Sequence, residues 1–311
     1  MRIRRLLLAV ALLSGTILFG FSGSALADDP PCQPWSVQTL ASGQHRLENL
    51  EFDRHGSLYL SAHEDGQIRR MDPSGQVTTV LSGVPSPGAI RFREDPRTHR
   101  QIMYFNTGNS LQSAELGTPD GTIQRYDRAN RVQSTWASGL VAPNGFTFLR
   151  SGDAVVSRDL GTGTGITHIP RQPDRYPVEP NWAALDGANG LVVAAPGTYL
   201  YTVLTFVPNS PVYRILIADP TQIELVADLG NAKGLDDLTG DSQGVLYITA
   251  NGSNEIIRLN PATGNICVIA NLLTGGPMNP TSVRVGRGSG WSQESVYTSA
   301  WDGTVRKLSP P

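Results

Sequence analysis

The amino-acid sequence predicts an all-β fold, a six-bladed β-propeller made of four-stranded blades. The 311 residues include 33 Gly and 22 Pro, and only 17% of them are charged. That composition is typical of turn-rich β proteins rather than of helical bundles. A strand–turn–strand motif also recurs six times along the chain at intervals of about 45 residues, which is the length of one propeller blade.

The repeat is clearest where residues 47–60 align without a gap with residues 235–248. Each copy has an alternating strand pattern, a turn and a second strand pattern, and a further hairpin follows, so each copy supplies about four strands. The copies begin at positions 48, 88, 144, 189, 236 and 281. In four copies a glycine follows the first position by eight residues, and we expect it in the turn: Gly56, Gly152, Gly197 and Gly244.

The strand pattern of residues 35–40 precedes the first copy and belongs to none of the six. We predict that this N-terminal strand pairs as the outer strand of the last blade and closes the ring. Such closure hides strand edges that would otherwise be free to pair with other chains.

Residues 1–27 have the pattern of a signal peptide. Three arginines lie within the first five residues, an apolar stretch follows, and small residues end the segment at Ala25-Leu26-Ala27. The alternative is a membrane anchor, for which the apolar stretch is near the lower limit of length. We favour cleavage, which leaves residues 28–311 as a single propeller domain with no membrane span, in a secreted or periplasmic protein.

The chain has two cysteines, Cys32 and Cys267. Export to an oxidising compartment would permit a disulfide between them, which would tie the N-terminal segment to the body of the fold. The alternative is two separate thiols, with Cys267 buried in a strand. We favour the disulfide; two cysteines are too few for a zinc site of the usual kind.

The first position of each copy should lie near the entrance of the central channel, because the first strand of each blade lines the axis of a propeller. These positions are Glu48, Gly88, Asn144, Asn189, Asp236 and Thr281. Two carboxylates and two carboxamides therefore converge. Hard divalent cations prefer such oxygen ligands, and Ca²⁺ tolerates irregular geometry better than Mg²⁺. The alternative is structural, since Asn-Gly is a common turn dipeptide and acids also cap strands at a wet channel mouth.

This arrangement resembles the calcium-dependent six-bladed propellers of the regucalcin and gluconolactonase family, whose more distant relatives are diisopropylfluorophosphatase and the paraoxonases. The resemblance implies that Glu48, Asn144, Asn189 and Asp236 bind Ca²⁺ or another divalent cation. It also implies that Asp236 acts as general base or nucleophile and that Asn144 contacts the substrate. The sequence departs from the family where Glu48-Asn49-Leu50 replaces Glu-Gly-Pro and Leu235-Asp236-Asp237 replaces Pro-Asp-Gly.

We therefore predict an exported calcium-dependent hydrolase of lactones or related esters, with phosphotriesters as a further class that the resemblance implies. The alternatives are a binding propeller without catalysis and a relative with non-hydrolytic chemistry. The loops after each second strand should surround the site, and among them His63 is either a substrate contact or a solvent-exposed loop residue. We expect a monomer with a small-molecule substrate and, given a net charge of -2, no nucleic-acid partner.

Overall fold

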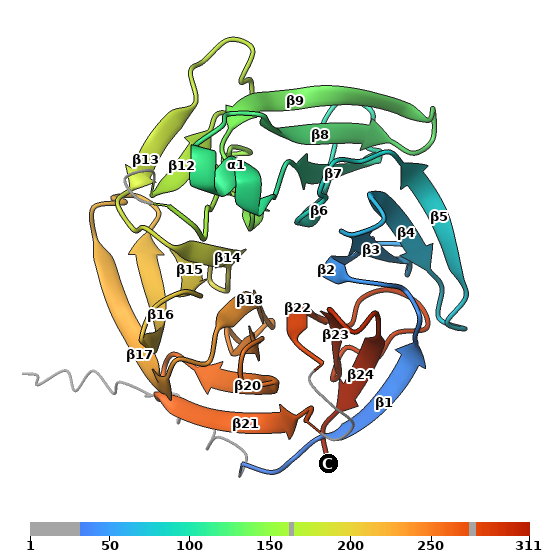
Figure 1. Ribbon diagram of the computed structural model, residues 1–311, viewed down its shortest axis with the longest axis vertical. Helices are drawn as coiled ribbons and strands as arrows, with labels where there is room; N and C mark the ends of the chain where they lie inside the picture. Colours follow the sequence, from blue (N-terminus) through green and yellow to red (C-terminus); the bar gives the residue numbers. More distant parts are fainter. Residues whose placement is uncertain (1–31, 162–164, 274–277) are drawn as a thin grey trace, which may run out of the picture. The chain divides into compact units, whose positions relative to one another are not determined.

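Six four-stranded antiparallel sheets surround a central axis in the computed structural model, which describes residues 32–161, 165–273 and 278–311. The predicted six-bladed propeller is confirmed (Figure 1). The predicted signal peptide, residues 1–27, lies outside the described residues. Of the helices in the described ranges, none has both the length and the apolar character needed to cross a membrane.

The blades follow one another along the chain, each from its inner to its outer strand. Blade 1 contains β2 (Leu47–Phe52), β3 (Leu58–Ala62), β4 (Gln67–Met71) and β5 (Val77–Ser82). Blade 2 contains β6 (Ile90–Glu94), β7 (Gln101–Thr107), β8 (Gly121–Asp127) and β9 (Val132–Leu140). Blade 3 contains β10 (Phe146–Phe148), β11 (Ala154–Val156), β12 (Ile166–Ile169) and β13 (Glu179–Ala183).

The second half of the ring repeats this pattern. Blade 4 contains β14 (Ala188–Val193), β15 (Tyr199–Leu204), β16 (Asn209–Leu216) and β17 (Ile223–Asn231). Blade 5 contains β18 (Leu235–Gly240), β19 (Leu246–Ala250), β20 (Glu255–Asn260) and β21 (Asn265–Asn271). Blade 6 contains β22 (Pro280–Val285), β23 (Val296–Ala300), β24 (Val305–Ser309) and, on its outside, β1 (Ser36–Ala41).

The predicted turn glycines have the backbone conformation that the repeat requires. Gly56 and Gly244 have φ values of 82° and 83°, and Gly152 and Gly197 both have 92°. L-residues with side chains rarely adopt such values. The same offset in four blades therefore reflects one turn geometry, which sets the register between each first and second strand.

The core lies between neighbouring blades, because the inner strands bury both faces whereas the outer strands expose one. The second strands β3, β19 and β23 are buried along their whole length, whereas the outer strand β1 is largely exposed. Phe52, Trp291 and Tyr297 pack edge to face between blades 1 and 6, with ring centroids 5.0 to 5.3 Å apart. Such apolar packing holds adjacent blades together.

The N-terminal strand closes the ring as the sequence predicts. β1 pairs antiparallel with β24, from Ser36 opposite Ser309 to Ala41 opposite Val305. Just before β1, the structure joins Cys32 and Cys267 in a disulfide, so the N-terminal segment is also attached to blade 5. The segment therefore fastens blade 6 to its neighbour as well as completing its sheet.

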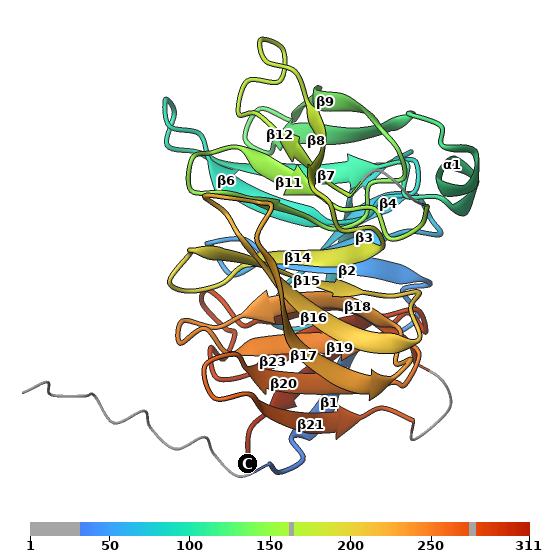
Figure 2. The same cartoon turned by 90° about the vertical axis from the view of Figure 1, so that its left-hand side faces the viewer.

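The loop after β7 contains the helix α1 (Leu111–Leu116). Ser110 caps its N-terminus, since its Oγ accepts a hydrogen bond from the Ser113 N–H at 3.1 Å. Gly117, with φ of 64°, ends it. In Figure 2 α1 projects beyond the ends of the strands, on the side where each second strand ends.

Candidate functional site

Bulges in the inner strands direct the first position of several copies towards the axis. In blades 1, 4, 5 and 6 the pairing of the first two strands shifts by one residue, so the first strand holds one extra residue there. The shifts enclose Glu48, Asn189, Asp236 and Thr281. A bulge re-aims a side chain and frees it from the ladder, which leaves Asn189 and Asp236 free to form a hydrogen bond with each other across two blades.

The glycines that follow Asn144 and Asn189 allow the neighbouring blade to pack closely, and they do not form turns. A Cβ on Gly145 would collide with the main-chain oxygen of Asn189, and one on Gly190 would lie 2.6 Å from the Cα of Asp237. The structural alternative for the two Asn-Gly pairs, a turn, therefore does not apply. Close packing of successive inner strands requires glycine and places each asparagine beside the next blade's ring position.

Two carboxamides hold the carboxylate of Asp236. The Asn189 Nδ2 donates to Oδ1 at 3.1 Å, and the Asn251 Nδ2 donates to Oδ2 at 3.2 Å. Asn189 is itself fixed by Thr205, whose Oγ1 lies 2.8 Å from the same Nδ2. Because the Nδ2 of Asn189 makes both contacts, its Oδ1 is available to another ligand. Asn251 lies just after β19, in one of the loops after second strands that were predicted to surround the site.

Glu48 meets residues from two other blades at the mouth. Its Oε1 lies 3.4 Å from the Nδ2 of Asn109, and its Oε2 lies 3.3 Å from the indole Nε1 of Trp301. The guanidinium carbon of Arg46 stacks 3.9 Å above the Trp301 ring, a favourable cation–π contact. Both of these hydrogen bonds to Glu48 are long and come from neutral donors, so a stronger ligand could replace them.

Negative charge accumulates among these side chains. Burial raises the pKa of Asp236 well above its usual value, and the charge of Glu48 raises it further. The charges of Asp237 and Asp159 act in the same direction. Burial also raises the pKa of Asp159 to about 6, although its hydrogen bond with Asn144 opposes that rise. Asp159 thus belongs to the same cluster as Glu48, Asn144 and Asp236.

This donor set fits a hard divalent cation. Within the described ranges no group of three or more His, Cys, Asp or Glu side chains forms a metal site by itself, so a cation would need carboxamide oxygens as well as carboxylates. Ca²⁺ accepts both types. A cation at this position would also relieve the repulsion that raises the pKa of Asp236.

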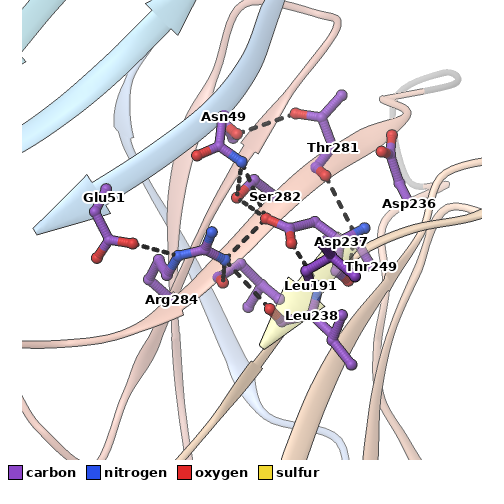
Figure 3. Close-up of polar contacts among 12 residues, drawn as sticks. Asn49, Glu51, Leu191, Asp236, Asp237, Leu238, Thr249, Thr281, Ser282 and Arg284 are labelled. Carbon is purple, nitrogen blue, oxygen red and sulfur yellow. Dashed lines mark hydrogen bonds and ion pairs between the residues drawn. The ribbon is translucent and has the colours of Figure 1, made fainter. Parts of the chain in front are cut away.

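A second polar network lies beside Asp236 (Figure 3). It centres on Asp237, whose Oδ2 accepts hydrogen bonds from Asn49 at 3.1 Å, Ser282 at 2.5 Å and Arg284 at 2.8 Å. The Arg284 Nε also donates to Glu51 at 2.9 Å. Asp237 and Arg284 are 4% and 5% exposed. The sequence repeat does not predict this network, because its residues follow the ring position rather than share it.

The network connects the inner strands of several blades. Arg91 of blade 2 lies 3.4 Å from Glu51 of blade 1 and donates to the main-chain oxygen of Leu191 in blade 4. Its guanidinium is buried, and burial lowers its pKa to about 10. Two arginines thus neutralise the two acids here, so Asp237 is paired inside the protein whereas Asp236 lacks a cationic partner among the contacts described above.

The remaining predicted positions, Thr281, Gly88 and His63, contact residues that lie around the cluster. Thr281 donates from Oγ1 to the main-chain oxygen of Leu47, next to Glu48, at 3.0 Å. Gly88 packs against Asn106, whose Nδ2 donates to the main-chain oxygen of Asn144 at 2.6 Å. His63 lies in the loop after β3, with its Nδ1 3.2 Å from the Pro87 oxygen. Its role as a substrate contact stays a prediction.

No protein-family model and no curated protein sequence matches the chain. Similar solved structures include a gluconolactonase from Xanthomonas campestris, with a TM-score of 0.66 and 13% identity over 91% of this chain and 98% of that one. They also include the calcium-binding protein regucalcin from Agrobacterium tumefaciens, with a TM-score of 0.62 and 16% identity over 89% of this chain and 94% of that one. The chain has the propeller fold of gluconolactonase and regucalcin.

The same fold also occurs in an enzyme of another class. A virginiamycin B lyase from Staphylococcus aureus matches with a TM-score of 0.63 and 13% identity over 89% of this chain and 100% of that one. At these identities the similarity describes the architecture of this propeller and leaves its reaction open. Function must therefore be argued from the side chains at the channel mouth.

Proposed function

We propose that this chain is an exported, calcium-dependent hydrolase of lactones or related esters. The observation that carries the proposal is the convergence of Glu48, Asn144, Asn189 and Asp236 at one channel mouth. Their inner strands belong to four different blades, and burial together with the charge of Glu48 raises the pKa of Asp236. Carboxylates that repel each other, next to available carboxamide oxygens, are suitable ligands for a divalent cation.

The four side chains would hold the cation, which when bound would polarise the carbonyl oxygen of a lactone. Asp236 would accept a proton from the attacking water, or would itself attack the carbonyl carbon, open the ring and form an acyl intermediate that water then hydrolyses to free the carboxylate. Asn189 and Asn251 fix the carboxylate for either role, because each holds one of its oxygens. The carbonyl carbon gains the hydroxyl group and the ring oxygen gains the proton, which gives a hydroxy acid. Asn144 and His63 would contact the substrate.

Export is supported by two independent features of the chain. Residues 1–27 have the pattern of a signal peptide. The disulfide between Cys32 and Cys267 fits an oxidising compartment, where such bonds form and persist. We propose that the protein works in the periplasm or outside the cell, as a monomer.

Calcium titration tests the metal site. Protein stripped with EDTA is titrated with Ca²⁺ in a calorimeter, as wild type, as Asp236→Asn and as the control Glu294→Gln. Glu294 is an exposed acid outside the cluster. We expect one binding event per chain, weakened at least tenfold by Asp236→Asn and unchanged by Glu294→Gln. No binding by the wild type would refute the metal site and favour a binding propeller.

Hydrolysis tests the reaction. Gluconolactone, γ-butyrolactone and a phosphotriester are incubated with the protein in the presence of calcium and of EDTA. We expect lactone opening that requires calcium and is lost in Asp236→Asn. Calcium binding without hydrolysis of any of these substrates would refute the hydrolase and leave the non-hydrolytic alternatives.

A further inference from the structure

Large apolar side chains are exposed in loops at the same end of the propeller as the candidate ligands. Eleven such side chains are exposed among the described residues, and five lie in loops at the end where the second and fourth strands of each blade finish. They are Leu111, Leu116, Phe206, Leu273 and Trp301. The exposed fractions of Leu111, Leu116 and Phe206 are 66%, 70% and 63%. All five lie at the end of the propeller that carries the candidate ligands, and apolar side chains exposed beside a few polar groups are typical of ligand-binding surfaces.

Hydrogen bonds connect three of these loops to the candidate metal ligands. Trp301 donates directly to Glu48. Leu111 lies two residues after Asn109, which also contacts Glu48. Phe206 follows Thr205, which contacts the carboxamide of Asn189. Three different blades therefore place an exposed apolar side chain at or near a contact with the cluster, and we call Leu111, Leu116, Phe206 and Trp301 the apolar rim.

A cavity lies next to Asn144, since Pro143 and Ser157, which adjoin that residue, are among its walls. Its volume is about 290 Å³, at the lower end of small-molecule pockets, and its walls include Leu140, Val141, Val156 and Val178. Arg158, which also lines it, donates from Nη2 to the main-chain oxygen of Ala114 at 2.6 Å. The helix α1, which carries Leu111 and Leu116, is thereby attached to the wall of this cavity.

We propose that the substrate carries an alkyl chain and that the apolar rim binds this chain while the oxygen cluster acts on the lactone or ester group. This inference deepens the proposed function and rests on it for the reacting group. A polyhydroxylated sugar lactone would leave its hydroxyl groups facing the leucines and the phenylalanine without hydrogen-bond partners. An alkyl-substituted lactone would instead bury apolar surface at the rim, which favours binding.

The test uses non-hydrolysable lactams, so that binding is read independently of catalysis. Calorimetry measures the affinity of the calcium-loaded protein for 2-pyrrolidinone and for its 5-butyl and 5-hexyl derivatives. We expect the affinity to rise about two- to fourfold for each added methylene. Leu111→Ser and Phe206→Ser should each reduce this rise, because both side chains are exposed and their replacement leaves the core unchanged.

Leu225→Ser is the matched control. Leu225 is also an exposed leucine, at 57%, but it lies on the outer strand β17 away from the mouth, so the dependence on chain length should be unchanged. Affinities that do not rise with chain length would overturn the inference. Binding to phosphatidylcholine vesicles that depends on Leu111 and Phe206, together with flat lactam affinities, would assign the rim to a lipid surface and also overturn it.

Hydrolysis of the matching lactones separates the two proposals. Chain-length-dependent lactam binding without hydrolysis of any lactone would refute the proposed function and still support the apolar rim. Calcium-dependent hydrolysis that is faster for gluconolactone than for the alkyl lactones, with flat lactam affinities, would support the hydrolase and overturn the rim as a substrate site.

Discussion

Replacing Arg284 with methionine should destabilise the propeller strongly. Arg284 is 5% exposed, donates to Asp237 at 2.8 Å and to Glu51 at 2.9 Å, and joins the inner strands of blades 1, 5 and 6. Methionine fills similar space without charge, so the two carboxylates lose this partner. Removing one member of a buried ion pair costs about 3 to 5 kcal/mol, which is a large share of a typical total stability of about 5 to 15 kcal/mol.

Urea unfolding followed by tryptophan fluorescence measures this effect. The matched control is Arg214→Met, whose partner Glu224 lies 2.6 Å away in an exposed pair. An exposed pair contributes only about 0 to 1 kcal/mol, so the control should unfold almost like the wild type. A loss in Arg284→Met no larger than in Arg214→Met would refute the reasoning that a buried charge is left unpaired.

The double variant Arg284→Met/Asp237→Asn sharpens the measurement. In the wild type the Leu238 N–H donates a hydrogen bond to the Asp237 Oδ1 at 2.8 Å. Asparagine at position 237 removes the charge but keeps an oxygen that can accept this bond. The double variant should therefore lose about 1 to 3 kcal/mol less than the sum of the single variants. Additive losses would show that the two side chains act independently.

Two further predictions concern pH and the disulfide. In calcium-free protein, Asp159 has a pKa of about 6 instead of 3.8, so its contribution to stability is complete below pH 3.8 and falls by about 3 kcal/mol as the pH rises through 6. In EDTA the melting temperature should be lower at about pH 7.5 than at about pH 5, whereas in calcium it should not fall. An equally large fall in Asp159→Asn would contradict the role of Asp159. Replacing Cys32 and Cys267 with serine should lower the free energy of unfolding by about 2 to 4 kcal/mol, and unchanged urea midpoints would contradict that value.

The blades could be predicted from the sequence because each repeat itself specifies how its first two strands pair. The offset of eight residues between the ring position and a turn glycine fixes the length of the first strand, and Gly56 and Gly244 occupy the positive-φ turns that this offset implies. Glu48 and Asp236 therefore occupy equivalent bulges. The N-terminal strand could be assigned for a related reason, since it had no blade of its own.

The rest of the site could not be predicted, because it depends on how loops from different blades meet. Asp159, Asn251 and Trp301 all lie just after second strands, and nothing in the repeat states which of them reaches the axis. The network around Asp237 was missed for another reason. The bulge in β18 leaves two successive acids near the channel, and only the positions of Arg284 and Asn49 show that one is paired inside the protein.

The pairing of β1 with β24 has a consequence for the order of folding. The Oγ of Ser36 donates to the main-chain oxygen of Ser309, a separation of 273 residues along the chain. During synthesis β1 therefore stays unpaired until nearly the whole chain has been made. Contacts this distant in sequence form slowly. Ring closure is thus expected to be a late step, and until then β1 presents an unpaired edge with which other strands can pair.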